Sequence, residues 1–326
     1  MNQLYPLKFY PILKDKIWGG SRLRNILHKT GASIVCGESW DIADVNDDVS
    51  MISNGFLAGN NLNELIEIYL GDLVGDSVYE VFGEKFPLLI KFIDANDKLS
   101  IQVHPDDTMA REYHNCPGKA EMWYIVDHEP GAELIVGFNQ KVDDKIYLDH
   151  LNNNTLPEIL NFEKVKKGDV FYLPPGRIHA IGAGILLAEI QQSSDITYRI
   201  FDWNRKDDKG NPRELHTDLA LKAIDFNYYP CYKSKYETRL NHTSNMVDCP
   251  YFFTNVLYFD KPVEKDYILI DSFVIYIAVD GNFIIKTEGI ENVEVVKGEC
   301  VLIPAAIKNL ILEPKGLAQI LEVYIK

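Results

Sequence analysis

Short apolar runs of strand length recur along the chain, separated by turns rich in glycine, proline, asparagine and aspartate. Runs of this kind are typical of buried β-strands. The chain turns β-rich again from Tyr251, with a hairpin turn expected at Asp280-Gly281. In the central part, the pattern predicts strands over residues 121–128, 133–138, 169–173, 184–192 and 196–203. We therefore expect a mostly β protein.

Helical spacing of apolar residues is confined to a few stretches. The clearest covers about 61–82, which we expect to be broken into two pieces near Gly71 or Gly75. A second helix is expected over about 214–226, and Asp106 is positioned to cap a short one. Because the helices are few, we expect them to lie in insertions of a β fold and between its two barrels.

Four polar side chains follow a pattern that predicts a metal site. The segment Gly168–His179 has a glycine turn, an apolar strand, a Pro-Pro-Gly bend and then a histidine at the start of the next strand. Upstream, Gln102 and His104 are two residues apart in a β-rich segment, so both point to one face of the sheet. Glu121 begins the next strand. Two imidazoles and a carboxylate suit Zn²⁺ or Fe²⁺, whereas Mg²⁺ and Ca²⁺ prefer oxygen ligands alone.

The segment Gly168–His179 resembles the second conserved motif of the cupin superfamily. The whole set of motifs resembles the type I phosphomannose isomerases, also called mannose-6-phosphate isomerases. The chain lacks the large helical insertion of the long eukaryotic members, so it resembles the short bacterial form. The other matching segments are Lys16–Gly20, Gly37–Asp41, Leu99–Asp107, Gly118–Ile125 and Gln191–Arg205.

This resemblance implies a function and a role for each motif residue. It implies one zinc ion per chain, held by Gln102, His104, Glu121 and His179, and a catalytic role for Arg199. It also implies an isomerase of carbohydrate metabolism that interconverts mannose 6-phosphate and fructose 6-phosphate, an aldose and a ketose, through an enediolate. The guanidinium of Arg199 stays protonated, so we expect it to stabilise negative charge rather than act as a base.

The phosphate group needs hydrogen-bond donors, and the resemblance places a serine and a lysine near it, which are Ser100 and Lys91 here. Lys91 lies between two apolar residues, so its side chain could instead extend to solvent. Lys119 precedes Glu121 by two residues, so both lie on one face of their strand and Lys119 is expected beside the metal.

Two further residues are candidates for the site. Trp18 is expected in its wall, although a tryptophan before Gly-Gly packs equally well in a core. Glu189 follows an apolar run, so burial could raise its pKa and make it a candidate base. An exposed position for Glu189 on the pleated strand is the equally open alternative.

Two other functions remain open on the residues alone. His104, Glu121 and His179 are also a two-histidine-one-carboxylate set, as in an iron-dependent cupin oxygenase. A non-catalytic sugar-binding cupin is the second alternative. Gln102 and the nearby Lys119 and Arg199 argue against the oxygenase, and the retention of all four ligands together with Arg199 argues against a non-catalytic protein.

An internal repeat predicts two domains of one type. Lys167–Gly176 recurs as Lys297–Ala306, at an offset of 130 residues. His179 in the first copy corresponds to Asn309 in the second, so the second copy is expected to bind no metal. The expected domains are two cupin-type, jelly-roll β-barrels: a catalytic one over 1–240 and a degenerate one over 241–326.

Composition limits the partners and the location. The chain has 326 residues with 33 basic and 48 acidic ones, a net charge of −15, so it would repel nucleic acid. No stretch reaches the ~20 apolar residues of a membrane span. The five cysteines show no paired spacing, which favours reduced thiols in the cytoplasm. We expect a small sugar phosphate as partner, and no obligatory protein partner is evident.

Overall fold

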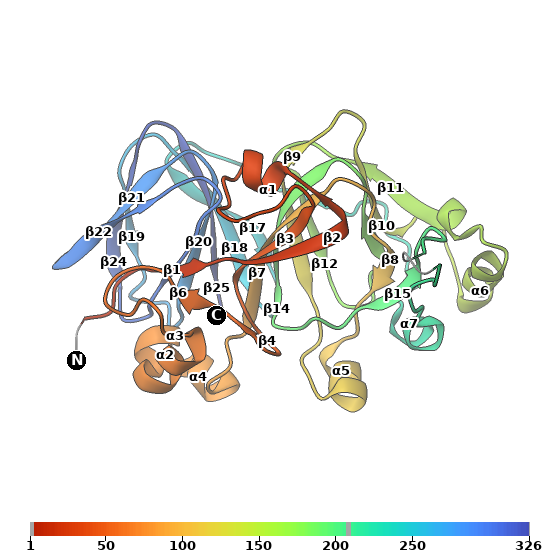
Figure 1. Ribbon diagram of the computed structural model, residues 1–326, viewed down its shortest axis with the longest axis horizontal. Helices are drawn as coiled ribbons and strands as arrows, with labels where there is room; N and C mark the ends of the chain where they lie inside the picture. Colours follow the sequence, from red (N-terminus) through yellow and green to blue (C-terminus); the bar gives the residue numbers. More distant parts are fainter. Residues whose placement is uncertain (1–2, 207–209, 326) are drawn as a thin grey trace.

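The computed structural model describes residues 3–206 and 210–325. The fold is mostly β, as predicted, and its four large sheets form two sandwiches that lie side by side (Figure 1). No helix in these ranges is long and apolar enough to cross a membrane.

The N-terminal sandwich consists of a seven-stranded and a five-stranded sheet. In spatial order, the seven strands are β16 (Lys233–Ser234), β12 (Val170–Leu173), β9 (Glu121–His128), β14 (Ile185–Gln192), β7 (Leu88–Ala95), β3 (Cys36–Ile42) and β2 (Ile12–Gly20). The five strands are β11 (Leu160–Lys164), β10 (Glu133–Phe138), β13 (His179–Ile181), β8 (Ile101–Val103) and β15 (Tyr198–Phe201). Apolar side chains such as Trp123, Phe171 and Leu134 fill the space between the sheets.

The C-terminal sandwich consists of a seven-stranded and a four-stranded sheet. The seven strands are β17 (His242–Asp248), β18 (Phe253–Phe259), β25 (Ala318–Tyr324), β20 (Val274–Asp280), β23 (Cys300–Ile303), β1 (Leu7–Tyr10) and β6 (Met51–Ile52). The four strands are β19 (Val263–Asp266), β24 (Asn309–Pro314), β21 (Phe283–Thr287) and β22 (Ile290–Val295). Two short strands, β4 (Asp44–Val45) and β5 (Asp48–Val49), pair separately. Strands β1 and β6 thus belong to the C-terminal sandwich in space, and the domain division at residue 240 stays a prediction.

The helices cover the outside of the sandwiches. They are α1 (Arg22–Asn25), α2 (Leu62–Tyr69), α3 (Gly71–Val74), α4 (Asp76–Phe82), α5 (Asp107–His114), α6 (Asp144–Asn152), the 3₁₀ helix η1 (Leu156–Ile159) and α7 (Thr217–Ala223). The segment expected as two helices forms three, because both Leu70 (φ +48°) and Gly75 (φ +98°) leave the helical conformation. Helix α7 is shorter than predicted, and α6 was not predicted. Helices α6 and α7 pack on the outer face of the five-stranded sheet (Figure 1).

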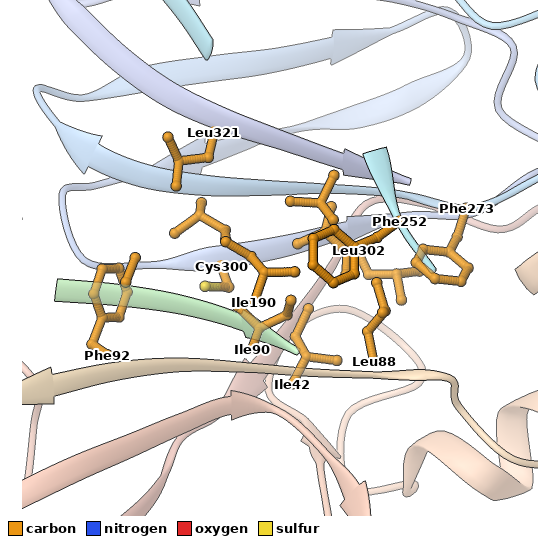
Figure 2. Packing of buried hydrophobic residues seen from close by; sticks show 14 of the residues in the cluster. Ile42, Leu88, Ile90, Phe92, Ile190, Phe252, Phe273, Cys300, Leu302 and Leu321 are labelled. Carbon is orange, nitrogen blue, oxygen red and sulfur yellow. The ribbon is translucent and has the colours of Figure 1, made fainter. Parts of the chain in front are cut away.

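The two seven-stranded sheets pack against each other through their outer faces. Figure 2 shows Ile90, Phe92 and Ile190 of the N-terminal sheet next to Leu302 and Leu321 of the C-terminal sheet. These side chains are all buried. A continuous apolar layer of this kind joins the sandwiches into one body.

The hairpin expected at Asp280-Gly281 is not formed, so this prediction is wrong. Strand β20 pairs with β25 and β23, whereas β21 pairs with β24 and β22. Gly281 has φ +68°, and a Cβ there would lie 2.2 Å from the carbonyl oxygen of Leu317. The turn therefore requires glycine, but it carries the chain from one sheet of the C-terminal sandwich to the facing one.

Candidate metal centre and substrate cavity

The four side chains expected as metal ligands lie together between the two sheets of the N-terminal sandwich. Gln102 lies in β8, His104 follows that strand, and His179 opens β13 directly opposite Gln102. Glu121 opens β9 in the facing sheet. The five-stranded sheet thus contributes three of these groups and the seven-stranded sheet contributes the carboxylate.

The turn before His179 is fixed against His104. The N–H of Gly176 donates to the carbonyl oxygen of His104 over 2.9 Å. Gly176 has φ +86°, and a Cβ there would lie 2.8 Å from the carbonyl oxygen of Ala223. The Pro-Pro-Gly motif therefore requires its glycine, and the turn sets the two imidazoles in place relative to each other.

Both imidazoles point an unprotonated nitrogen at one carboxylate. Nε2 of His179 lies 3.2 Å from Oε1 of Glu121, and Nε2 of His104 lies 3.4 Å from Oε2. Nδ1 of His104 lies 2.8 Å from the carbonyl oxygen of Ile196, and Nδ1 of His179 lies 2.8 Å from that of Arg177. Because a carbonyl oxygen only accepts, each Nδ1 carries the proton and each Nε2 presents a lone pair.

This arrangement fits a bound cation. Ligand atoms of His104, Glu121 and His179 all lie within 4.8 Å of one another. In the described part of the chain, neither oxygen of Glu121 nor Nε2 of His104 has a hydrogen-bond partner, although all are buried. The amide nitrogen of Gln102 lies 3.2 Å from Nε2 of His179, and a rotation of that amide would place its oxygen there instead. Nitrogen and oxygen ligands in this number suit a divalent transition metal.

The protonation states of the cluster agree with ligand chemistry. Burial, and next the positive charge of Lys119, lower the pKa of His104 to about 3. Burial also lowers the pKa of His179. Burial alone would raise the pKa of Glu121, but His179, Lys119 and His104 together hold it below its ordinary value. At neutral pH the cluster therefore consists of two neutral imidazoles and a carboxylate.

A cavity of ≈ 340 Å³ opens beside Gln102. It is large enough for a small polar ligand. All the remaining side chains that we named from the sequence line it, namely Trp18, Lys91, Ser100, Lys119, Glu189 and Arg199. The structure thus brings every expected site residue to one place, while their individual roles stay predictions.

Lys91 and Glu189 form a buried ion pair in the wall of the cavity. They are cross-strand partners in β7 and β14, with Nζ 3.0 Å from Oε1. Oε2 of Glu189 accepts a hydrogen bond from Nε1 of Trp123 over 2.7 Å. Burial opposes the charge of Lys91, but Glu189 and Glu38 outweigh it and raise the pKa of Lys91. The charge of this lysine is therefore already balanced within the protein.

Arg199 differs from Lys91, because the protein leaves its charge available. It lies in β15 directly opposite Gln102. Its Nε donates to Oγ of Ser100 over 3.3 Å, and its Nη1 donates to the carbonyl oxygen of Glu214 over 3.0 Å. Both acceptors are neutral groups, so the guanidinium is oriented without being neutralised.

Sequence reasoning missed several residues of the cavity. Lys16 and Glu38 line it as a pair, with Nζ 3.1 Å from Oε1. Both lie in segments that carried the family resemblance, so that signal was present. Asp195 and Arg213 line it too. Arg213 lies in the loop before α7, which has no periodic pattern to mark it.

Known proteins similar to this chain identify its family. The family described as phosphomannose isomerase type I, catalytic domain, matches residues 7–147. The mannose-6-phosphate isomerase ManA of Bacillus subtilis is 38% identical over 253 residues, 76% of this chain and 77% of that one. The mannose-6-phosphate isomerase of Streptococcus mutans is 35% identical over 308 residues, 93% of this chain and 94% of that one. This chain belongs to the type I phosphomannose isomerase family.

Solved structures agree with this family assignment. The crystal structure of the mannose 6-phosphate isomerase from Bacillus subtilis superposes with a TM-score of 0.88 at 31% identity, over 99% of this chain and 100% of that one. A putative mannosephosphate isomerase from Archaeoglobus fulgidus has a TM-score of 0.81 at 21% identity, which supports the fold alone. The predicted family, the mostly β fold and the isomerase class are thereby confirmed.

Proposed function

We propose that this protein interconverts mannose 6-phosphate and fructose 6-phosphate, with zinc as its metal. The observation that supports this most directly is the cluster of buried lone pairs from His104, Glu121 and His179, which adjoins a cavity containing Arg199, whose hydrogen-bond acceptors among the described residues are neutral. The relatives from Bacillus subtilis and Streptococcus mutans are both named as mannose-6-phosphate isomerases.

The chemistry of this isomerisation matches the site. A proton moves between C2 and C1 of the open sugar through an enediolate, and negative charge develops on the neighbouring oxygens. Zinc held by Gln102, His104, Glu121 and His179 would supply Lewis acidity to those oxygens. The Nδ1 hydrogen bonds described above keep both imidazoles in the tautomer that zinc requires.

Arg199 would add a second source of positive charge. Ser100 and Glu214 fix its planar guanidinium beside Gln102, so it can stabilise a developing oxyanion without reorganising. Lys119 lies beside the proposed metal ligands, with its Nζ 3.6 Å from Oε2 of Glu121. Lys119 would bind a sugar oxygen near the reacting carbons.

Glu189 is better suited to positioning than to proton transfer. Its two oxygens are engaged by Lys91 and Trp123. A base that removes a carbon-bound proton needs a free oxygen directed at the sugar. We propose that Glu189 holds Lys91 in the wall of the cavity and that Trp18 forms another part of that wall.

A coupled assay tests the proposed reaction. Formation of fructose 6-phosphate from mannose 6-phosphate should be rapid, should stop with a chelator and should return with added zinc. Elemental analysis of protein purified without added metal distinguishes zinc from iron. No turnover of mannose 6-phosphate by metal-loaded protein would contradict the proposal.

The free thiols of all five cysteines further support a cytoplasmic location.

A further inference from the structure

The positive charges of the cavity are divided unequally between its two sides. In the described part of the chain, five cations line it: Arg213 pairs with Asp202, which lies outside the lining, Arg199 has no salt bridge, and the three lysines are each paired with a carboxylate of the site. These pairs are Lys16–Glu38 at 3.1 Å, Lys91–Glu189 at 3.0 Å and Lys119–Glu121 at 3.6 Å. Asp195, the other carboxylate in the lining, also acts on the charge of Lys91. Among the described residues, Arg199 therefore lacks a salt-bridge partner, and Arg213 shares the carboxylate of Asp202 with a second arginine, Arg205.

Arg213 is held in place by a buried carboxylate. Its Nε donates to Oδ2 of Asp202 over 2.6 Å, and its Nη2 donates to Oδ1. Asp202 is only 5% exposed, and its Oδ1 also accepts from Nε and Nη2 of Arg205, over 3.1 and 2.5 Å. A bidentate contact of this kind fixes the plane of a guanidinium. One carboxylate thus orients two arginines and cannot neutralise both.

The two cavity arginines are linked by a hydrogen bond to the loop backbone and by the repulsion of their charges. Glu214, the residue after Arg213, orients Arg199 through its carbonyl oxygen. Burial, and next the positive charge of Arg213, lower the pKa of Arg199. The carboxylates of Asp202 and Glu214 also act on Arg199, but Asp202 is shared with Arg213 and Arg205, so this group of cations favours binding of an anion with more than one negative charge.

We propose that Arg213 determines the preference of this site for a phosphorylated sugar: fixed by Asp202 beside Arg199, it binds the phosphoryl dianion. This inference rests on the proposed isomerase function and deepens it. Arg199 lies opposite the proposed metal ligand Gln102, and the loop that carries Arg213 bonds to Arg199 through the carbonyl oxygen of Glu214 and the N–H of His216. A substrate with its reacting carbons near the metal and its phosphate near Arg213 would therefore extend along the cavity past Arg199.

Steady-state kinetics of Arg213→Gln test this role. We expect KM for mannose 6-phosphate to rise about 10- to 100-fold, the range expected for one charge-assisted hydrogen bond, with kcat changed much less. The ratio of kcat/KM for mannose 6-phosphate to that for unphosphorylated mannose should fall by the same factor. Arg213→Lys, which keeps the charge but loses the planar fork, should give an intermediate KM.

Arg205→Gln is the matched control, because Arg205 shares Asp202 but does not line the cavity. Its KM and its preference for the phosphorylated sugar should stay near those of the wild type. If Arg205→Gln changes them as much as Arg213→Gln does, the effect is one of loop structure and the proposal is overturned.

Binding of inorganic phosphate provides a readout that does not depend on turnover. In thermal-shift titrations with metal content matched between samples, phosphate should raise Tm of the wild type and of Arg205→Gln, but much less that of Arg213→Gln. An equal rise in all three overturns the role of Arg213, even if the isomerase activity is established. A wild type that binds phosphate through Arg213 but does not isomerise mannose 6-phosphate would contradict the proposed function alone.

Discussion

Both sandwiches contain a buried glutamate–lysine pair, but within residues 3–206 and 210–325 the cluster that could hold a metal lies in the N-terminal sandwich alone. In the N-terminal sandwich, Glu189 lies opposite Trp123 in the neighbouring strand. In the C-terminal sandwich, Glu322 lies opposite Tyr276 at the corresponding position. Both carboxylates are buried, and each is paired with a lysine: Lys91 at 3.0 Å for Glu189 and Lys265 at 2.5 Å for Glu322.

The metal ligands are where the sandwiches differ. Glu121 lies opposite Leu173 in the N-terminal sandwich, and the equivalent pair in the C-terminal one is Val274 and Ile303. Valine at this position removes the carboxylate. The buried glutamate–lysine pair is therefore found both with and without the carboxylate of the candidate metal cluster. This indicates that the pair stabilises the fold, whereas the expected ligands serve the chemistry.

The largest expected effect is that of His179→Ala. The variant loses one of two imidazoles, so metal content should fall from one ion per chain to nearly none, and activity by roughly 10³-fold. The fold should survive, because both apolar cores remain. Asn309→Ala, at the aligned position of the C-terminal sandwich, should keep one ion and full activity. Two tightly bound ions per wild-type chain, or a fully loaded His179→Ala, would contradict this comparison.

Lys91→Met and Lys265→Met test the two buried glutamate–lysine pairs. Each leaves a buried glutamate without its cation, so each should lower the free energy of unfolding by about 3–5 kcal/mol. Only Lys91→Met should also impair turnover, since only Lys91 lines the cavity. Urea denaturation followed by tryptophan fluorescence measures the first effect. If one variant is as stable as the wild type, the two pairs are not equivalent.

Arg199→Lys should reduce kcat by about 100-fold while leaving metal content and stability nearly unchanged. Lysine keeps the charge but loses the planar fork that Ser100 and Glu214 orient. Arg239→Lys, at an exposed position outside the cavity, is the matched control and should have wild-type kinetics. A kcat near the wild-type value for Arg199→Lys would remove Arg199 from the reaction.

The smallest expected effect is that of Tyr276→Phe. Tyr267 donates its hydroxyl proton to Glu322, so the hydroxyl of Tyr276 donates to that of Tyr267. Loss of this bond should lower stability by about 1–2 kcal/mol. Activity should not change, because this network lies in the C-terminal sandwich, away from the candidate metal cluster of the N-terminal one. Reduced turnover in a fully folded variant would show that the C-terminal sandwich acts on the site.

The sequence was most informative where a motif determines its own local structure. The order of turn, strand and histidine in Gly168–His179 depends on a few neighbouring residues, and β12 and β13 form as predicted. The spacing of two residues between Gln102 and His104 is another pattern that depends only on neighbouring residues. These short-range patterns were sufficient to name the residues that now lie in one cluster, although their binding of a metal stays a prediction.

Features that depend on distant contacts were not predictable. The internal repeat aligns Asn309 with His179. In the structure, however, Asn309 is exposed and Leu310 lies in the interior. The strand is thus shifted by one residue relative to the alignment, which exchanges its inward and outward side chains. The turn at Asp280-Gly281 has hairpin residues, yet sheet pairing elsewhere decides its role. Arg213 is oriented by Asp202, 11 residues earlier, and no periodic pattern records such a contact.

The two pairings of strand β1 have a consequence for the order in which this protein folds. Leu7 pairs with Leu302, so β1 completes its sheet only through a contact between residues that lie far apart in the sequence. Contacts so distant in sequence form slowly, because a long loop must close first. The pairing of β1 with β6 joins Phe9 to Ile52, which are much closer in the sequence, so it requires a shorter loop to close. We therefore expect β1 and β6 to pair first and to join β23 late in folding.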